Sequence, residues 1–228
     1  MAELVVAFDT CGPVIGVAAA SETATATRSE RIRRGAEGRL IPWAQEVCAE
    51  LGGGLDDVVG VVAARGPGAF TGLRVGLSAA IGLAIALDVP IWGGDSLTTR
   101  RSTAPDGRVL IMLDARKQRV YACAFDGDQM VVPPADVAPE IAVAWMKAPF
   151  TATGEGAVVY RQVVEAQGGT VVEEADAPAT EALARAGWSA IRAGDGRRPE
   201  SLEPLYLRPA DAKPSRRGRL TRETKRRS

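Results

Sequence analysis

The chain has 228 residues, of which 46% are hydrophobic, and its 28 basic side chains balance its 28 acidic ones. A chain of this length can bury one substantial core or two smaller ones, and its zero net charge creates no overall field toward nucleic acid or membranes. It contains no histidine, which excludes Ser-His-Asp and Cys-His catalysis and zinc sites built on imidazole.

Cysteine usage and apolar patterning indicate a reducing compartment. Cys11, Cys48 and Cys123 are an odd number without a CxxC pair, which argues against a disulfide framework. The N-terminus shows no signal pattern, and the longest uncharged apolar stretch, residues 75–87, is too short to cross a bilayer of about 30 Å. We therefore expect a cytoplasmic protein that does not contact a membrane.

The first half of the chain predicts a run of strands and helices with glycine-rich boundaries. Pro42 falls in the first turn of the first helix, and three glycines at 52–54 stop that helix. The expected order is three strands, a helix, a strand, a helix and a strand, at residues 4–8, 14–20, 23–31, 40–51, 58–64, 73–87 and 89–92.

The second half repeats this order. The expected elements are three strands, a helix, a strand, a helix, a strand and a helix, at residues 108–113, 119–125, 129–132, 139–147, 150–153, 158–167, 170–173 and 179–193. A duplicated βββαβα order predicts an α/β protein of two related lobes, spanning 1–105 and 106–210.

The segment 66–76 joins a buried strand to a helix through a glycine-rich turn. Backbone N–H groups at a helix N-terminus suit anions, but no Gly-Lys-Ser/Thr follows, so this is not a Walker loop. Tight strand-to-helix reversal explains the glycines equally well. The helix that follows is rich in glycine and alanine, which indicates close approach of a neighbour, either inside the subunit or in another chain.

The last residues form a basic segment. From residue 213 onward there are eight basic residues and one acidic residue, Glu223, with almost no apolar side chains. Such a composition predicts a disordered tail over 211–228, either merely solvated or in contact with tRNA.

The residues at 66–76, Gly-Pro-Gly-Ala-Phe-Thr-Gly-Leu-Arg-Val-Gly, closely resemble the signature of the TsaB (YeaZ) family. Its signature loop corresponds to Gly66, Pro67, Gly68, Phe70, Thr71 and Gly72. Further similarity runs in order along the chain at 6–10, 39–42, 82–84, 95–97, 114–116, 120–121 and 204–208.

This resemblance implies an actin-like, Hsp70-like (ASKHA) fold and a role in making threonylcarbamoyladenosine at position 37 of tRNAs that read ANN codons. Members of the family pair with the catalytic paralogue TsaD and work with the ATPase TsaE. ATP and metal belong to that complex, so the resemblance implies a non-catalytic subunit with no cofactor of its own. Where TsaD carries a metal-binding histidine pair, this chain has none.

The apolar and small residues of the helices at 40–51 and 73–87 predict a surface that meets the equivalent helices of TsaD, and that pairs two copies into a homodimer when TsaD is absent. The residues expected at this interface are Leu40, Trp43, Val47, Leu73, Arg74, Gly76, Leu77, Ala80 and Ile81. If they lie on such a surface, Gly76→Glu and Leu77→Glu should stay folded yet lose both partners.

An alternative interpretation is an actin-fold ATPase or small-molecule kinase. Asp9, Thr10 and Asp114 are its nucleotide candidates, because two aspartates follow corresponding strands of the two lobes. Aspartates in such places also cap turns, and Pro13 removes a backbone donor from the first loop. The lack of histidine argues against a second alternative, that the chain is a metalloprotease. A third alternative is a standalone tRNA-binding protein, which would bind through the basic tail.

Two departures from the family pattern argue against catalysis by the residues at these positions. Ala69 stands where the family usually has serine, and residues 36–38 replace a segment that commonly holds a histidine.

Overall fold

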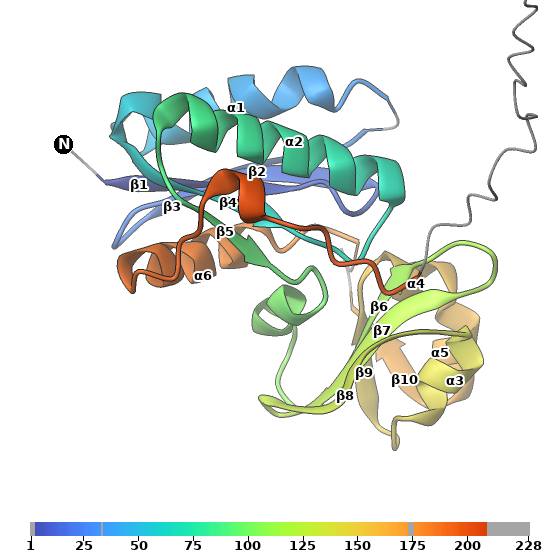
Figure 1. Cartoon of the computed structure of the whole chain (residues 1–228). Coiled ribbons are helices and arrows are strands. Elements are labelled where there is room, and N and C mark those ends of the chain that lie inside the picture. The colour runs from blue at the N-terminus through green and yellow to red at the C-terminus, as the bar shows by residue number, and fades with distance from the viewer. Residues whose placement is uncertain (1–2, 33, 173–175, 209–228) are drawn as a thin grey trace, which may run out of the picture.

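The computed structural model of the chain describes residues 3–32, 34–172 and 176–208. Two five-stranded mixed sheets, with strand orders β3-β2-β1-β4-β5 and β10-β9-β6-β7-β8, form two lobes (Figure 1). The basic tail and its predicted disorder lie outside the described residues.

The first sheet is built from β1 (Leu4–Asp9), β2 (Val14–Ala20), β3 (Thr25–Arg31), β4 (Val58–Ala64) and β5 (Ile91–Gly94). β1 pairs antiparallel with β2 and parallel with β4. All six residues of β1 are buried, as expected for an apolar strand covered on both faces. Helices α1 (Glu37–Glu50) and α2 (Phe70–Leu87) cover one face of this sheet, and α6 (Thr180–Arg192) covers the other (Figure 1).

The second sheet contains β6 (Arg108–Asp114), β7 (Val120–Asp126), β8 (Gln129–Val137), β9 (Phe150–Thr153) and β10 (Gly169–Val171). Its helices are α3 (Pro139–Ala144), α4 (Glu155–Val159) and α5 (Arg161–Ala166). Three short 3-10 helices complete the described chain: η1 (Leu55–Asp57), η2 (Thr98–Thr103) and η3 (Pro199–Ser201).

The two sheets repeat one topology. Each has an antiparallel meander of three strands, and its first strand then pairs in parallel with a fourth: β1 with β4, and β6 with β9. The duplicated order of strands and helices predicted from the sequence is confirmed. The helix predicted at 179–193, however, does not pack on the second sheet.

The lobe boundary expected at 106–210 is therefore corrected. Leu183, Ala184 and Leu202 belong to the hydrophobic core of the first lobe. The apolar face of α6 packs against the first sheet, so the second lobe consists of residues 108–172 and the chain then returns to the first.

The C-terminal segment 202–208, called the strap below, joins the two lobes again. In the first lobe, Leu205 N–H donates to Arg65 O at 2.7 Å. In the second, the Arg208 guanidinium donates to both carboxylate oxygens of Asp136, at 2.7 and 2.9 Å, and to Ala115 O at 3.1 Å. Figure 1 shows the strap, in red, running from the first lobe toward β6 and β7.

Helix α2 is long and apolar enough, by length and composition alone, to cross a membrane, a test that core helices of soluble proteins also pass. Only a third of its residues are buried against the sheet. Much of its apolar surface is therefore uncovered within the chain.

Candidate functional site

The signature loop packs against other parts of the chain. Gly66 has φ of 104°, and a Cβ atom added there would lie 2.8 Å from Leu205 O. At Gly68 an added Cβ would lie 2.6 Å from Cys11. Because Ala69 N–H already donates to Cys11 O at 2.8 Å, the loop's glycines are explained by tight packing rather than by an anion.

The glycines at the start of α2 make room for Thr10. A Cβ atom added at Gly72 would lie 2.2 Å from Thr10 O, and one added at Gly76 would lie 2.2 Å from Thr10 Oγ1. The Thr10 hydroxyl donates to Gly72 O at 2.7 Å. The residue that packs closely against these two glycines is thus Thr10 of the same subunit.

The three nucleotide candidates, Asp9, Thr10 and Asp114, are all bonded to other residues of the chain. Asp9 and Thr10 are each 2% exposed, and Asp9 Oδ1 accepts a hydrogen bond from Cys11 N–H at 3.0 Å. Asp114 accepts from Arg116 N–H at 2.9 Å and pairs with the Arg116 guanidinium at 3.0 Å. These contacts are those of aspartates that cap turns.

Sequence reasoning missed a buried arginine between the lobes. Arg100, on η2, is 2% exposed, and its Nη1 donates to Ser96 O at 2.6 Å. The same nitrogen lies 3.8 Å from Asp9 Oδ2. Arg100 Nε and Nη2 have no hydrogen-bond partner among the described residues. A positive charge of the chain itself therefore sits at the end of β1.

A second unpredicted group faces this arginine from the other lobe. Glu155 begins α4, and its side chain lies against the turn after β1, since a Cβ atom added at Gly12 would be 3.6 Å from the carboxylate. Burial raises the pKa of Glu155 to about 7, Arg100 opposes that rise, and Asp9 and Asp114 add to it. Glu155 Oε2 has no partner within the described chain.

We call Asp9, Arg100 and Glu155 the interlobe cluster. In this cluster the Arg100 guanidinium interacts with carboxyl groups from both lobes. The turn Gly154-Glu155-Gly156, between a strand and a helix, was a sequence signal for a constrained position. Arg100 had no such signal, because it lies in a polar segment that resembles an exposed loop.

Neither a metal site nor a reactive cysteine is found among the described residues. Among them, no group of three or more His, Cys, Asp or Glu side chains could hold a metal ion. All three cysteines are buried and unpaired. Burial raises the pKa of Cys48 to about 11 and those of Cys11 and Cys123 as well, so these thiols are held protonated.

Seven of the nine residues predicted at a partner interface lie in the subunit's own core. They are Leu40, Trp43, Val47, Leu73, Gly76, Leu77 and Ala80, each buried against the first sheet. The helical spacing was interpreted correctly, but the stripe it defines faces inward. A charge at Gly76 or Leu77 would enter this core, so neither substitution can test an interface. Arg74 is exposed, and Ile81 is half-buried and also packs against the core of the first lobe.

The outward side of α2 is made of other small and apolar residues. Ser78, Gly82, Ile85 and Ala86 are exposed, with Ile85 53% exposed. An atom added at Gly82 would meet nothing within 4 Å. No contact among the described residues requires a glycine there, although glycine in a helix costs about 0.5–1 kcal/mol relative to alanine.

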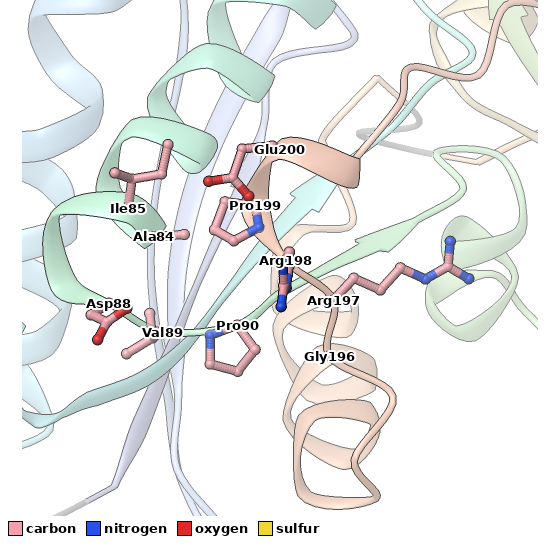
Figure 2. A pocket seen from close by; sticks show the side chains of 10 residues that line it. All are labelled: Ala84, Ile85, Asp88, Val89, Pro90, Gly196, Arg197, Arg198, Pro199 and Glu200. Atoms are coloured by element: carbon pink, nitrogen blue, oxygen red, sulfur yellow. The ribbon is translucent and has the colours of Figure 1, made fainter.

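A groove of about 380 Å³ continues this surface at the end of α2. Figure 2 shows Ile85 on α2 opposite Pro199 and Glu200, while Arg197 points away from the groove. Its lining mixes apolar residues, such as Val89 and Pro90, with the charged residues Asp88, Arg198 and Glu200.

Comparison with known proteins finds a family model described as "TsaD: tRNA N6-adenosine threonylcarbamoyltransferase" matching residues 30–191. An Escherichia coli protein named "tRNA threonylcarbamoyladenosine biosynthesis protein TsaB" is 32% identical over 129 residues, which are 55% of this chain and 56% of that protein. The match thus spans little more than half of that relative's length. An uncharacterised Mycobacterium tuberculosis protein is 32% identical over 219 residues, covering 92% of this chain and 94% of its own.

Among solved structures, YeaZ from Pseudomonas aeruginosa superposes with a TM-score of 0.77 at 27% identity, covering 90% of this chain and all of that one. The predicted α/β fold of two related lobes is therefore confirmed, and it is the fold of YeaZ.

Proposed function

Because the chain belongs to the family whose model is described as "TsaD: tRNA N6-adenosine threonylcarbamoyltransferase", and because it is similar to proteins named TsaB and YeaZ, we propose that it is a TsaB-type, non-catalytic subunit that binds and activates TsaD. The complex would form threonylcarbamoyladenosine at position 37 of ANN-decoding tRNAs, in the cytoplasm. TsaE would join through the TsaB–TsaD pair, and ATP and metal would be held by the complex rather than by this chain.

The observation that carries this proposal is the uncovered side of α2. An exposed apolar strip of small residues, with an unexplained glycine at its centre, is typical of a helix that another helix approaches closely. TsaD is the family's paralogue, so two similar helix pairs can pack across such a surface. Without TsaD, a second copy of the chain would occupy it, giving a homodimer.

A non-catalytic role is supported by the interlobe cluster. In an actin-like enzyme, carboxylates at the strand ends of both lobes would face a metal-bound nucleotide. Here Arg100 lies beside Asp9 in that place, and Asp114 is paired with Arg116. A fixed guanidinium repels a divalent cation, so these contacts oppose the ATPase or kinase alternative. Calorimetric titration with Mg-ATP should give no binding heat to the isolated chain.

The test of the interface uses charge on the outer side of α2. Gly82→Glu is expected to leave the circular dichroism spectrum and melting temperature close to those of the wild type, because the added side chain enters open space. It should abolish co-purification with TsaD, and the free chain should elute as a monomer, since a carboxylate would be desolvated at the interface.

The matched control is Ala166→Glu, which places the same charge at an exposed position of α5 on the other lobe. This variant should bind TsaD as the wild type does. If Gly82→Glu is folded and still binds with wild-type affinity, the outer side of α2 is not the docking surface.

A further inference from the structure

A cluster of two aromatic side chains and one arginine lies where α2 begins and the strap passes. Phe70 and Tyr206 stack with ring centroids 5.7 Å apart. The Arg74 guanidinium lies 3.8 Å from the centre of the Phe70 ring, and its Nε donates to Tyr206 Oη at 3.2 Å. We call Phe70, Arg74 and Tyr206 the aromatic corner. It joins one side chain of the strap to two side chains of α2.

The aromatic corner continues the outward side of α2. Phe70 and Arg74 are exposed, and exposed residues follow at the same spacing of four positions at Ser78, Gly82 and Ala86. Residues four apart on a helix are neighbours on its surface and form one ridge. The ridge therefore runs from the aromatic corner to the open glycine on which the proposed docking surface is centred.

The exposed surface of the corner suits a protein partner. Phe70 is 46% exposed and Tyr206 44% exposed, so both rings keep open surface. Aromatic residues and arginine are enriched at protein interfaces, where tyrosine and arginine often contribute much of the binding energy. The corner holds one cation, Arg74, whose guanidinium is already bonded to Tyr206, so its surface is mainly aromatic rather than basic. A helix of TsaD that packs along the ridge fits both the rings and the open glycine.

The position of Tyr206 depends on the contacts of the strap with both lobes. Its neighbour Leu205 donates its N–H to Arg65 O of the first lobe, at 2.7 Å. Two residues after Tyr206, the Arg208 guanidinium holds the strap to the Asp136 carboxylate of β8 in the second lobe. A ring that is already held in place loses little entropy when a partner packs on it.

We propose that the aromatic corner is part of the surface that binds TsaD, and that the Arg208–Asp136 contact strengthens this binding by holding Tyr206 in place. The proposal rests on the proposed function, which supplies the partner. It links TsaD binding to the arrangement of the two lobes. The coupling is reciprocal, so bound TsaD also stabilises the contact between the strap and the second lobe.

The experiment measures the affinity of the full chain for TsaD by calorimetric titration. Tyr206→Ala should weaken binding about tenfold, because it removes an aromatic ring from the interface. Tyr206→Phe keeps the ring and should bind as the wild type does. Arg208→Ala should weaken binding about fivefold, which corresponds to the entropy of ordering one side chain on binding.

Arg119→Ala is the matched control for Arg208→Ala. Arg119 Nε donates to the same carboxylate of Asp136, at 2.8 Å, but Arg119 directly precedes β7, so this bond lies within the second lobe. Its loss leaves the strap attached, and the variant should bind TsaD as the wild type does. The melting temperature of every variant is measured, and the titrations are run well below the lowest of them, so that unfolding cannot weaken binding.

The double variant with Tyr206→Ala and Arg208→Ala distinguishes positioning from direct contact. If Arg208 acts through Tyr206, its substitution should change affinity little once the ring is absent, so the two effects are not additive. Additive effects, or wild-type affinity in a folded Tyr206→Ala variant, would overturn the proposal. Loss of the homodimer in Tyr206→Ala with TsaD binding intact would also overturn it, and would assign the corner to self-association. If the wild-type chain does not bind TsaD, the proposed function fails instead.

Discussion

Thr10 fills the space that a side chain at Gly76 would need: a Cβ atom built on Gly76 would lie 2.2 Å from Thr10 Oγ1. Six residues later on the same helix, a Cβ atom at Gly82 would meet nothing within 4 Å. Two glycines of one helix thus have opposite surroundings.

The same substitution at these two glycines should have opposite effects on stability. Gly76→Ala forces Thr10 or the helix to move and should lower the free energy of unfolding by about 2 kcal/mol. Gly82→Ala improves helix propensity in open space and should raise it by about 0.5–1 kcal/mol. Urea denaturation of the two variants measures both changes. A stabilised Gly76→Ala variant would show that the Thr10 contact is not tight.

Glu155 should make the chain less stable as pH rises from acid toward neutrality. Its pKa is about 7 in the folded protein against 4.5 for an ordinary glutamate, so the folded state favours the protonated carboxyl. Stability is therefore lost between about pH 4.5 and 7, by up to about 3 kcal/mol for a shift of this size. Glu155→Gln removes this loss.

The measurement compares the unfolding free energies of Glu155→Gln and the wild type at pH 5 and pH 8. The variant's advantage should be larger at pH 8, and taking the difference cancels the titration of other groups. An advantage that does not grow with pH would contradict the buried, uncompensated position of this carboxyl.

Removing the interlobe cation should be costly. Arg100→Met leaves Asp9 and Glu155 in the interior without the nearby positive charge, and we expect a loss of about 3 kcal/mol. Asp9→Asn in the same background should recover part of that loss, because it removes one of the stranded charges. Urea denaturation of both single variants and the double variant gives the coupling energy. Additive effects would mean that Arg100 and Asp9 do not interact.

The contact between the strap and the second lobe should respond to acid. Two arginines, Arg208 and Arg119, hold the pKa of Asp136 below its usual value despite partial burial. The pair with Arg208 therefore stabilises the fold at neutral pH and is lost as pH falls below about 4. Arg208→Ala should cost about 2 kcal/mol at pH 7, and this cost should shrink as pH falls below about 4 toward the lowered pKa of Asp136. A cost that does not shrink in acid would indicate that packing, not charge, secures the strap.

The sequence was informative where local pattern alone decides structure. The apolar run of β4 was predicted with its observed ends, 58–64, and both long helices over the first sheet were found within a few residues. Helical periodicity in α2 identified an apolar stripe, but it could not distinguish a stripe that faces the sheet from one that faces a partner. Leu73 and Leu77 turned out to face inward, and Gly82 was the informative outward residue.

Contacts between residues far apart in the chain could not be predicted from the sequence. α6 follows the second lobe in the chain, yet Leu183 completes the core of the first, and no local signal marks such a return. The burial of Arg100 likewise depends on Asp9, about ninety positions earlier, and on Glu155, in the other lobe. A basic side chain in a polar stretch ordinarily indicates solvent, so its role became visible only in three dimensions.

The strap also limits how the lobes can move. The chain crosses from the first lobe to the second through η2, and a linker alone would leave the lobes free to rotate about it. The clamp of Arg208 on Asp136 is a further attachment between the lobes, and it opposes such a rotation. The opening and closing by which two-lobed enzymes admit and release their substrates would therefore first require that the Arg208–Asp136 contact be broken.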